Sequence, residues 1–310
     1  MKIKILVAIT TLALAALAGC KGGSFGEAVD FKFNVAKGTK FTYGITMDMN
    51  MNQAVMGQNM KVNSKIAMGY QFEVLDDSAG WKRLSTTISR FAMHMNANGM
   101  NMDFDTDEPE NDSTGDGSPM EKVGKILGAL KGGQFVFTMN GDGQIGEITG
   151  IKDITSKILA RMPAEDTAIA AQSLEKTFNE ESFKQNMQQS FAMYPGKAVK
   201  PGDTWTKTMN MISNGMPMKL ENTYTLQSVE GDSIKVAVAS KITADGLSSI
   251  MPGMDISMTG DMKGLNTFNK TSGMPVSGDD NMTIDMKMKM QGQEVPMKMD
   301  MKMTMAGKKL

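Results

Sequence analysis

The feature of this sequence that most restricts its fold is a strict alternation of methionine with polar residues near the C-terminus. Residues 297–305 read MKMDMKMTM and residues 282–290 read MTIDMKMKM, so every second position is apolar in both segments. Successive side chains of a β-strand point to opposite faces, whereas a helix would scatter these methionines around its surface. The alternation therefore predicts strands with one apolar and one charged face, as in a half-buried antiparallel sheet.

Two further hairpins can be read with their registers. Asn98-Gly99 and Asn214-Gly215 are the dipeptide that two-residue hairpin turns prefer. The pairs that these turns predict are His94 with Asp103, Met95 with Met102, Met93 with Phe104, Met209 with Leu220, and Trp205 with Tyr224.

A third hairpin is predicted around a longer loop at residues 57–59. The strand before this loop carries one apolar row, and the strand after it carries another. The rows are Phe41, Tyr43, Ile45, Met47, Met49 and Met51, and Met60, Val62, Ile66, Met68, Tyr70, Phe72 and Val74. Period-two rows of this length indicate long, paired strands.

The two methionine-rich segments are predicted to form a fourth hairpin with a loop over residues 291–296. We expect Met290 to lie opposite Met297, because this register keeps both methionine rows on one face. It also places Asp285 beside Lys302, whereas a shift of the register by two residues brings like charges together. The charges are therefore expected to select the register.

These patterns predict an α+β, β-rich fold. We expect long antiparallel hairpins in a curved sheet or half-barrel, with helices in the middle of the chain. Residues 28–150 and 197–310 are predicted to form two similar β-rich modules, joined by a helical connection over residues 151–196. The similarity rests on echoes such as Tyr70–Val74 and Tyr224–Val229, each of which precedes a polar turn.

The N-terminus has the composition of a targeting segment. Lys2 and Lys4 precede an apolar run of 13 residues, 5–17, which is too short to span a bilayer. The run ends in Leu-Ala-Gly-Cys20, which resembles the lipobox of bacterial lipoproteins. Residues 1–19 are therefore expected to be a lipoprotein signal peptide, and residues 20–27 a lipidated Cys20 followed by a flexible tether. By the same resemblance, the residues after Cys20 favour a periplasm-facing outer-membrane location.

Four short segments carry a resemblance to a known family. They are Asp142–Gly150 (DGQIGEITG), Val199–Trp205 (VKPGDTW), Tyr224–Leu226 (YTL) and Thr271–Gly273 (TSG). Together they resemble landmarks of an uncharacterised bacterial lipoprotein family, a domain of unknown function numbered 6263. These landmarks are turns and strands, so the resemblance implies no active site. The expected architecture is also similar to that of the periplasmic lipoprotein carriers, which are curved half-barrels with helices over an apolar concave face.

The sequence argues against catalysis and against a cofactor. His94 is the only histidine, and the predicted hairpin places it on a polar strand face beside Asp103, where a solvated side chain is expected. The acidic stretch over residues 103–116 begins like a calcium loop at Asp112, but the twelfth position is Val123 instead of glutamate. We expect a mobile acidic loop there. A formal charge of −1 lacks the basic excess of a nucleic-acid-binding protein.

The 34 methionines allow two interpretations. Thioethers are ligands for Cu(I), but methionine also fills apolar positions interchangeably with Val, Ile, Leu and Phe here, and we favour adaptable apolar surface without a dedicated metal site. The expected function is that of a non-catalytic, lipid-anchored envelope protein that binds an apolar small molecule or lipid acyl chain. The predicted ligand-binding residues are Met286, Met288, Met299, Met301 and Met303. Soft-metal binding and a structural or interaction role in the envelope remain as alternatives, and the sequence identifies no protein partner.

Overall fold

The computed structural model describes residues 27–55, 58–108, 127–162, 171, 179–213, 216–245, 254–290 and 293–310. The predicted signal peptide at 1–19, Cys20, most of the predicted tether and most of the acidic stretch lie outside these residues.

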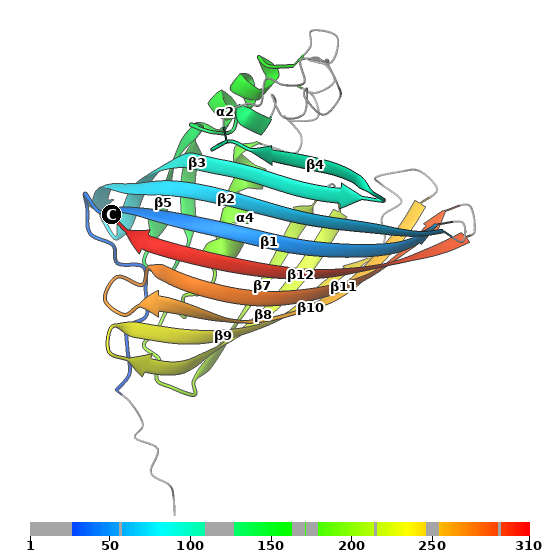
Figure 1. Cartoon of the computed structure of the whole chain (residues 1–310). Coiled ribbons are helices and arrows are strands. Elements are labelled where there is room, and N and C mark those ends of the chain that lie inside the picture. The colour runs from blue at the N-terminus through cyan, green and yellow to red at the C-terminus, as the bar shows by residue number, and fades with distance from the viewer. Residues whose placement is uncertain are drawn as a thin grey trace, which may run out of the picture.

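The described residues form one antiparallel sheet of 12 strands (Figure 1). Its strands are β1 (Lys40–Val55), β2 (Gln58–Ser78), β3 (Trp81–Ala97), β4 (Met100–Asp105), β5 (Gln134–Asn140), β6 (Ile145–Thr149), β7 (Thr204–Ser213), β8 (Met216–Glu230), β9 (Ser233–Asp245), β10 (Met254–Asn269), β11 (Pro275–Met290) and β12 (Gln293–Lys309). Their order across the sheet is β6-β5-β3-β2-β1-β12-β11-β10-β9-β8-β7, and β4 pairs with β3 beside this path. The β-rich character and the antiparallel hairpins predicted from the sequence are thus confirmed.

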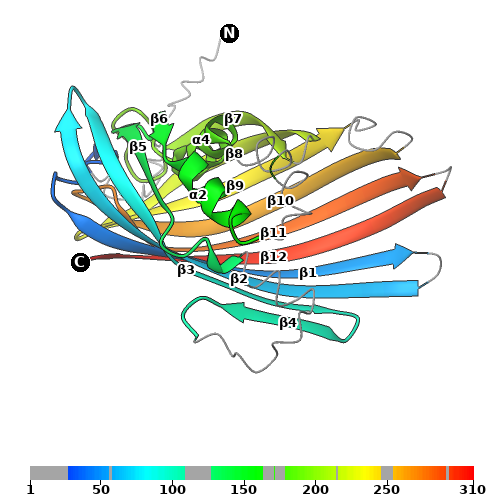
Figure 2. The ribbon, with the colours of Figure 1, turned by 90° about the horizontal axis from the view of Figure 1, so that it is seen from above.

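The sheet is bent into a trough, and the helices lie inside its curve (Figure 2). Register shifts between Gly69 and Tyr70 in β2, and between Leu226 and Ser228 in β8, mark bulges of the kind that bend a strand and increase its twist. Helix α2 (Ile151–Leu159) buries Ile151, Ile154 and Ile158, and so covers part of the concave face.

Helix α4 (Glu180–Phe191) is capped at its N-terminus by Asn179, whose side-chain oxygen accepts a hydrogen bond from the Ser182 backbone N–H at 2.9 Å. Its residues Phe183, Met187 and Phe191 recur every fourth position and pack against the buried core. Both helices therefore use one apolar side to cover the same concave face.

The expectation of two similar β-rich modules with helices in the middle is not confirmed. Strands from residues 40–149 and strands from residues 204–309 join in one continuous sheet through the pairing of β1 with β12. This pairing runs from Phe41 opposite Lys309 to Gln53 opposite Met297. It connects the first and last of the described strands at the middle of the sheet. The sequence of neither strand alone reveals this contact.

The registers predicted from Asn-Gly turns are confirmed. His94 lies opposite Asp103, and Trp205 lies opposite Tyr224. In the third hairpin the two predicted apolar rows also face each other, with Phe41 opposite Phe72. Side chains at residues 211–213 and 216 are outside the description, but the backbone pairing of β7 with β8 extends to both ends of that turn.

The register predicted for the methionine-rich hairpin is wrong by four residues. Met290 lies opposite Gln293 instead of Met297, and residues 293–296, predicted as loop, belong to β12. The observed register places Asp285 opposite Lys298. Opposite charges therefore meet in this register as well, so charge could not distinguish it from the predicted one. The shorter connection continues the strands and pairs more backbone groups.

Candidate ligand-binding face

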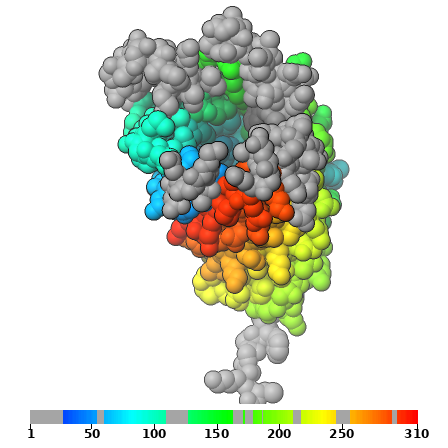
Figure 3. Space-filling view, turned by 90° about the vertical axis from the view of Figure 1, so that its right-hand side faces the viewer, coloured from blue at the N-terminus to red at the C-terminus, as the bar shows by residue number. Residues whose placement is uncertain are grey.

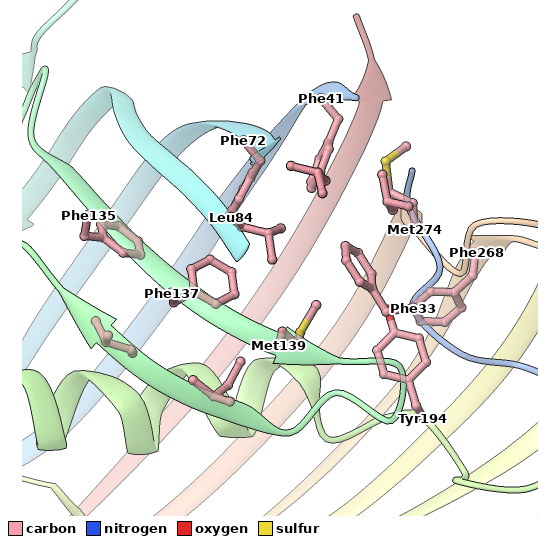
Figure 4. Packing of buried hydrophobic residues seen from close by; sticks show 14 of the residues in the cluster. Phe33, Phe41, Phe72, Leu84, Phe135, Phe137, Met139, Tyr194, Phe268 and Met274 are labelled. Carbon is pink, nitrogen blue, oxygen red and sulfur yellow. The ribbon is translucent and has the colours of Figure 1, made fainter. Parts of the chain in front are cut away.

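One end of the concave face is filled by aromatic side chains. Phe31 and Phe33, from the segment before β1, are each 1% exposed, and Phe31 packs against Tyr194 and Phe268 at centroid distances of 5.0 and 4.9 Å. The Tyr194 hydroxyl donates a hydrogen bond to the Gly273 carbonyl oxygen at 2.9 Å. Figure 4 shows Phe33, Tyr194 and Phe268 of this cluster together with aromatic residues of the strands, Phe41, Phe72 and Phe137. This end therefore forms a conventional packed core.

Toward the ends of β1 and β11, at Val55 and Met290, the same face is rich in methionine. Met49 of β1 lies opposite Met301 of β12, Met301 lies opposite Met282 of β11, and Met282 lies opposite Met262 of β10. These four residues, which we call the methionine rung, cross four adjacent strands that stand about 4.8 Å apart. All four are half-buried. The rung therefore presents soft apolar surface that the described residues only partly cover.

The structure brings the predicted ligand-binding methionines onto this face. Met286 and Met288 lie on β11, and Met299, Met301 and Met303 lie on β12. The cross-strand neighbours are Ile284 for Met299, Met282 for Met301 and Asp280 for Met303. All five are half-buried. Met286 and Met299 also pack against a second small core of Leu220, Ile242, Ala244, Met258 and Ile284.

A polar group that the sequence analysis did not identify lies within this face. Asp280 is 3% exposed and accepts a hydrogen bond from the Asn266 side-chain amide at 3.3 Å. Asn222 and Ser240 face each other across β8 and β9 and are 4% and 3% exposed. The side-chain oxygens of Asn222, Ser240 and Asn266 have no hydrogen-bond partner in the described part of the chain. Period-two counting could have found Asp280, because it shares its strand face with Met282 and Ile284.

Burial sets the ionisation of these groups. It raises the pKa of the Asp280 carboxyl above its usual range, and the neighbouring charge of Asp279 adds to this effect. Burial likewise raises the pKa of Tyr224 to about 12 and that of Tyr70 to about 12, and it raises the pKa of Tyr43 even more strongly. The Tyr43 hydroxyl donates to the Met305 sulfur at 2.7 Å. Burial on this face thus favours the neutral forms of the Asp280 carboxyl and of these three tyrosines.

The predicted position of His94 is confirmed. Its Nδ1 contacts the Asp103 carboxylate, and both side chains are more than half exposed on the outer surface. The acidic stretch is described only as far as Glu108, and there Asp107 forms an ion pair with Lys131 at 2.8 Å. Within the described ranges, no group of three or more His, Cys, Asp or Glu side chains is placed to hold a metal ion.

No helix in the described part of the chain is both long enough and apolar enough to cross a membrane.

Comparison with known proteins gives one family and several distant structures. A family model described as a family of unknown function, DUF6263, matches residues 79–275. No curated protein matches the sequence. A structure titled "Lipid-protein interactions in lipovitellin" is similar at a TM-score of 0.46 and 8% identity, covering 86% of this chain and 25% of that one. The chain thus spans about a quarter of the length of that protein.

Two bacterial structures are similar at lower scores. The translocator domain of the autotransporter NalP from Neisseria meningitidis has a TM-score of 0.22 and 8% identity, with 88% of this chain and 89% of that chain covered. Pseudomonas aeruginosa OpdQ has a TM-score of 0.22 and 6% identity, with 89% and 100% covered.

Proposed function

We propose a function for this chain, which belongs to DUF6263, a family of unknown function. In this proposal it is a non-catalytic protein that binds an apolar ligand, such as an acyl chain, on its methionine-rich concave face. The observation that carries this proposal is the methionine rung. Met49, Met301, Met282 and Met262 form a row of half-buried apolar side chains across four strands on the inside of a trough.

The character of the rung supports a lipid-like ligand. A folded protein rarely leaves a contiguous apolar surface open to water without a use, and concave apolar surfaces are typical of ligand sites. Methionine is unbranched and flexible, so a row of methionines can adapt to chains of varied shape. The aromatic cluster closes the other end of the concave face, which leaves the methionine half as the region available to a ligand.

Lipid anchoring at Cys20 is part of the same proposal. The residues before Cys20 support it, since a positive start, a short apolar run and Leu-Ala-Gly-Cys coincide. An anchor facing the periplasm from the outer membrane would hold the concave face close to a supply of acyl chains. Two or more acyl chains on one cysteine suffice for stable attachment.

A second candidate function is Cu(I) binding, and the methionine rung favours it as well. Thioethers on neighbouring strands of the rung, with about 4.8 Å between strands, are within reach of a common soft metal ion. The two functions depend on different properties of the methionine side chains. An acyl chain needs apolar volume, whereas Cu(I) needs sulfur.

Native mass spectrometry of the chain, stripped of lipid and then reloaded with hexadecanol, tests the acyl-chain proposal. We expect the wild-type protein to retain hexadecanol. The double variant Met49→Gln/Met301→Gln should lose at least about tenfold in affinity, because two amides would be desolvated without partners. A matched control is Met100→Gln, because Met100 is 74% exposed and is not part of the rung. Failure of the wild type to retain the alcohol, or equal binding by all three proteins, would reject the proposal.

A further inference from the structure

The tips of two hairpins separate at one end of the sheet and leave a cleft between them. Pairing of β1 with β12 stops at Gln53 opposite Met297, but β1 and β2 remain paired to Val55, and β11 and β12 remain paired to Met290. Figure 3 views this end, where the blue β1–β2 tip lies next to the orange-red β11–β12 tip. The cleft has a volume of about 500 Å³, within the range of roughly 300–1,000 Å³ that is typical of small-molecule sites.

On the inside of the sheet the cleft is lined by three methionines and by Gln53. Met60, Met286 and Met297 contribute their side chains there. Met297 lies opposite both Gln53 and Met286, so it borders the cleft and also begins the methionine row of β12. Met60 is 37% exposed, so part of its side chain is open to a ligand in the cleft. The cleft is thus continuous with the methionine half of the concave face.

The lining on the outside of the sheet is cationic. Asn52 lies between Lys61 of β2 and Lys298 of β12 in directly paired positions. The cleft residues include three lysines, Lys61, Lys287 and Lys298, against one acid, Asp285.

Two of these lysines are available to a ligand. Lys287 forms an ion pair with Glu294 at 3.4 Å. Asp285 lies opposite Lys298 across β11 and β12, but no ion pair joins them. Within the residues that the structure describes, neither Lys61 nor Lys298 has an ion-pair partner.

We propose that this cleft takes an anionic single-chain amphiphile, a long-chain fatty acid, with its carboxylate between Lys61 and Lys298. The chain then passes Met297 and Met286 and continues along the methionine row that ends at Met305. This inference rests on the proposed function and adds to it a ligand class, a point of entry and a residue pair for the head group.

The charges and the shape both favour this ligand. Hydrogen bonds between an ammonium group and a carboxylate are stronger than neutral ones, and two lysines on either side of Asn52 can share one carboxylate. The row from Met297 to Met305 extends about 26 Å at roughly 3.3 Å per residue, which accommodates one extended acyl chain. A neutral apolar ligand would fill the same row but would leave the lysines without a role.

Titration calorimetry with two probes of equal chain length tests the inference at pH 8, where the acid is ionised. The probes are palmitate and hexadecanol, and the protein is the full chain stripped of lipid. We expect wild type to bind palmitate about tenfold more tightly than hexadecanol, since a hydrogen bond to a charged group contributes more than a neutral one. The variant Lys61→Gln/Lys298→Gln should lose this preference and keep its affinity for hexadecanol.

The matched control is Lys65→Gln/Lys302→Gln. It changes the net charge equally on the same two strands, but these lysines are paired with Asp48 at 3.9 Å and Asp279 at 2.9 Å and do not line the cleft. We expect it to retain the preference for palmitate. Equal binding of both probes by wild type, or tight palmitate binding by Lys61→Gln/Lys298→Gln, would overturn the inference and leave the proposed function standing. If wild type binds neither probe, both are overturned.

Discussion

Trp205 and Tyr224 face each other across β7 and β8, with ring centroids 5.7 Å apart and ring planes inclined by 19°. Trp205 is 7% exposed, and its indole N–H donates to the Met193 carbonyl oxygen at 2.9 Å. Trp205→Ala removes this ring and leaves a cavity, so we expect the free energy of unfolding to fall by about 3–5 kcal/mol in a denaturant titration.

The chain contains its own control for that measurement. Trp81, the only other tryptophan, is 38% exposed. Trp81→Ala should cost less than about 1 kcal/mol, as is usual for substitutions near the surface. A cost below about 1 kcal/mol for Trp205→Ala as well would show that the Trp205–Tyr224 stack contributes little to stability.

Gly273 has a backbone φ of +66°, and a side chain there would overlap the Lys32 carbonyl oxygen. Gly273→Ala should therefore combine left-handed backbone strain of about 1–2 kcal/mol with overpacking of about 1–3 kcal/mol. Gly202 has a φ of +94° but no atom within 4 Å of such a side chain, so Gly202→Ala should cost the strain alone. Equal losses in thermal unfolding would mean that the segment around Lys32 moves aside freely.

Asp280 predicts a pH dependence of stability. Its folded-state pKa is raised by burial, whereas an unfolded aspartate titrates near roughly pH 3.9. Between these two values the folded chain binds the extra proton, so this residue makes stability fall as pH rises through that window, and above it the loss is constant. Asp280→Asn removes the ionisable group and keeps the shape. We expect the variant to be more stable than wild type at neutral pH.

The stability difference between Asp280→Asn and wild type should shrink as the pH falls toward 4. Urea unfolding at several pH values measures it. Asp285→Asn is a suitable comparison, because Asp285 is exposed on the same strand. A difference between wild type and Asp280→Asn that is independent of pH would show that Asp280 is not held in its neutral form.

The Cu(I) alternative can be separated from the acyl-chain proposal by one triple variant. Replacing Met299, Met301 and Met303 with leucine removes three thioethers and keeps the volume, so each change should cost less than about 1.5 kcal/mol. Under the acyl-chain proposal the variant still binds hexadecanol. A stoichiometric Cu(I) complex in wild type that the variant loses, measured by competition with a chromogenic chelator, would favour the metal function instead.

Anchoring at Cys20 has its own test. Cys20→Ser removes the only thiol of the chain, so we expect the protein to leave the membrane fraction or to keep its N-terminal segment. Fractionation and intact mass would show either result. A variant that is processed and sediments like wild type would contradict the proposed lipid attachment.

Local signals in the sequence predicted local pairing well. The Asn-Gly turns specify a two-residue connection, so the registers around residues 98–99 and 214–215 follow directly. The methionine-rich hairpin has no such turn signal. Opposite charges meet when Asp285 faces Lys298 and also when it faces Lys302, so the sequence did not distinguish the two registers.

Contacts between segments that lie far apart in the sequence could not be predicted from local patterns. Nothing in Met47 or in Met303 indicates that the two residues pair, although alternation correctly places each on an apolar face. The cleft between the hairpin tips exists only because of this pairing and the point at which it stops. Its lysines, Lys61 and Lys298, therefore appear in the sequence as ordinary charges on polar strand faces.

The pairing of β1 with β12 also determines when the sheet can be completed during synthesis and folding. The middle of the sheet cannot form until β12 (Gln293–Lys309) has been synthesised, because β12 pairs with β1. Until then, any sheet formed by the strands of residues 40–149 has an open edge at β1. Folds dominated by such distant contacts form slowly, and unpaired edges invite aggregation in the interval. Deleting β12 would open the sheet along its centre, because β12 joins β1 to β11.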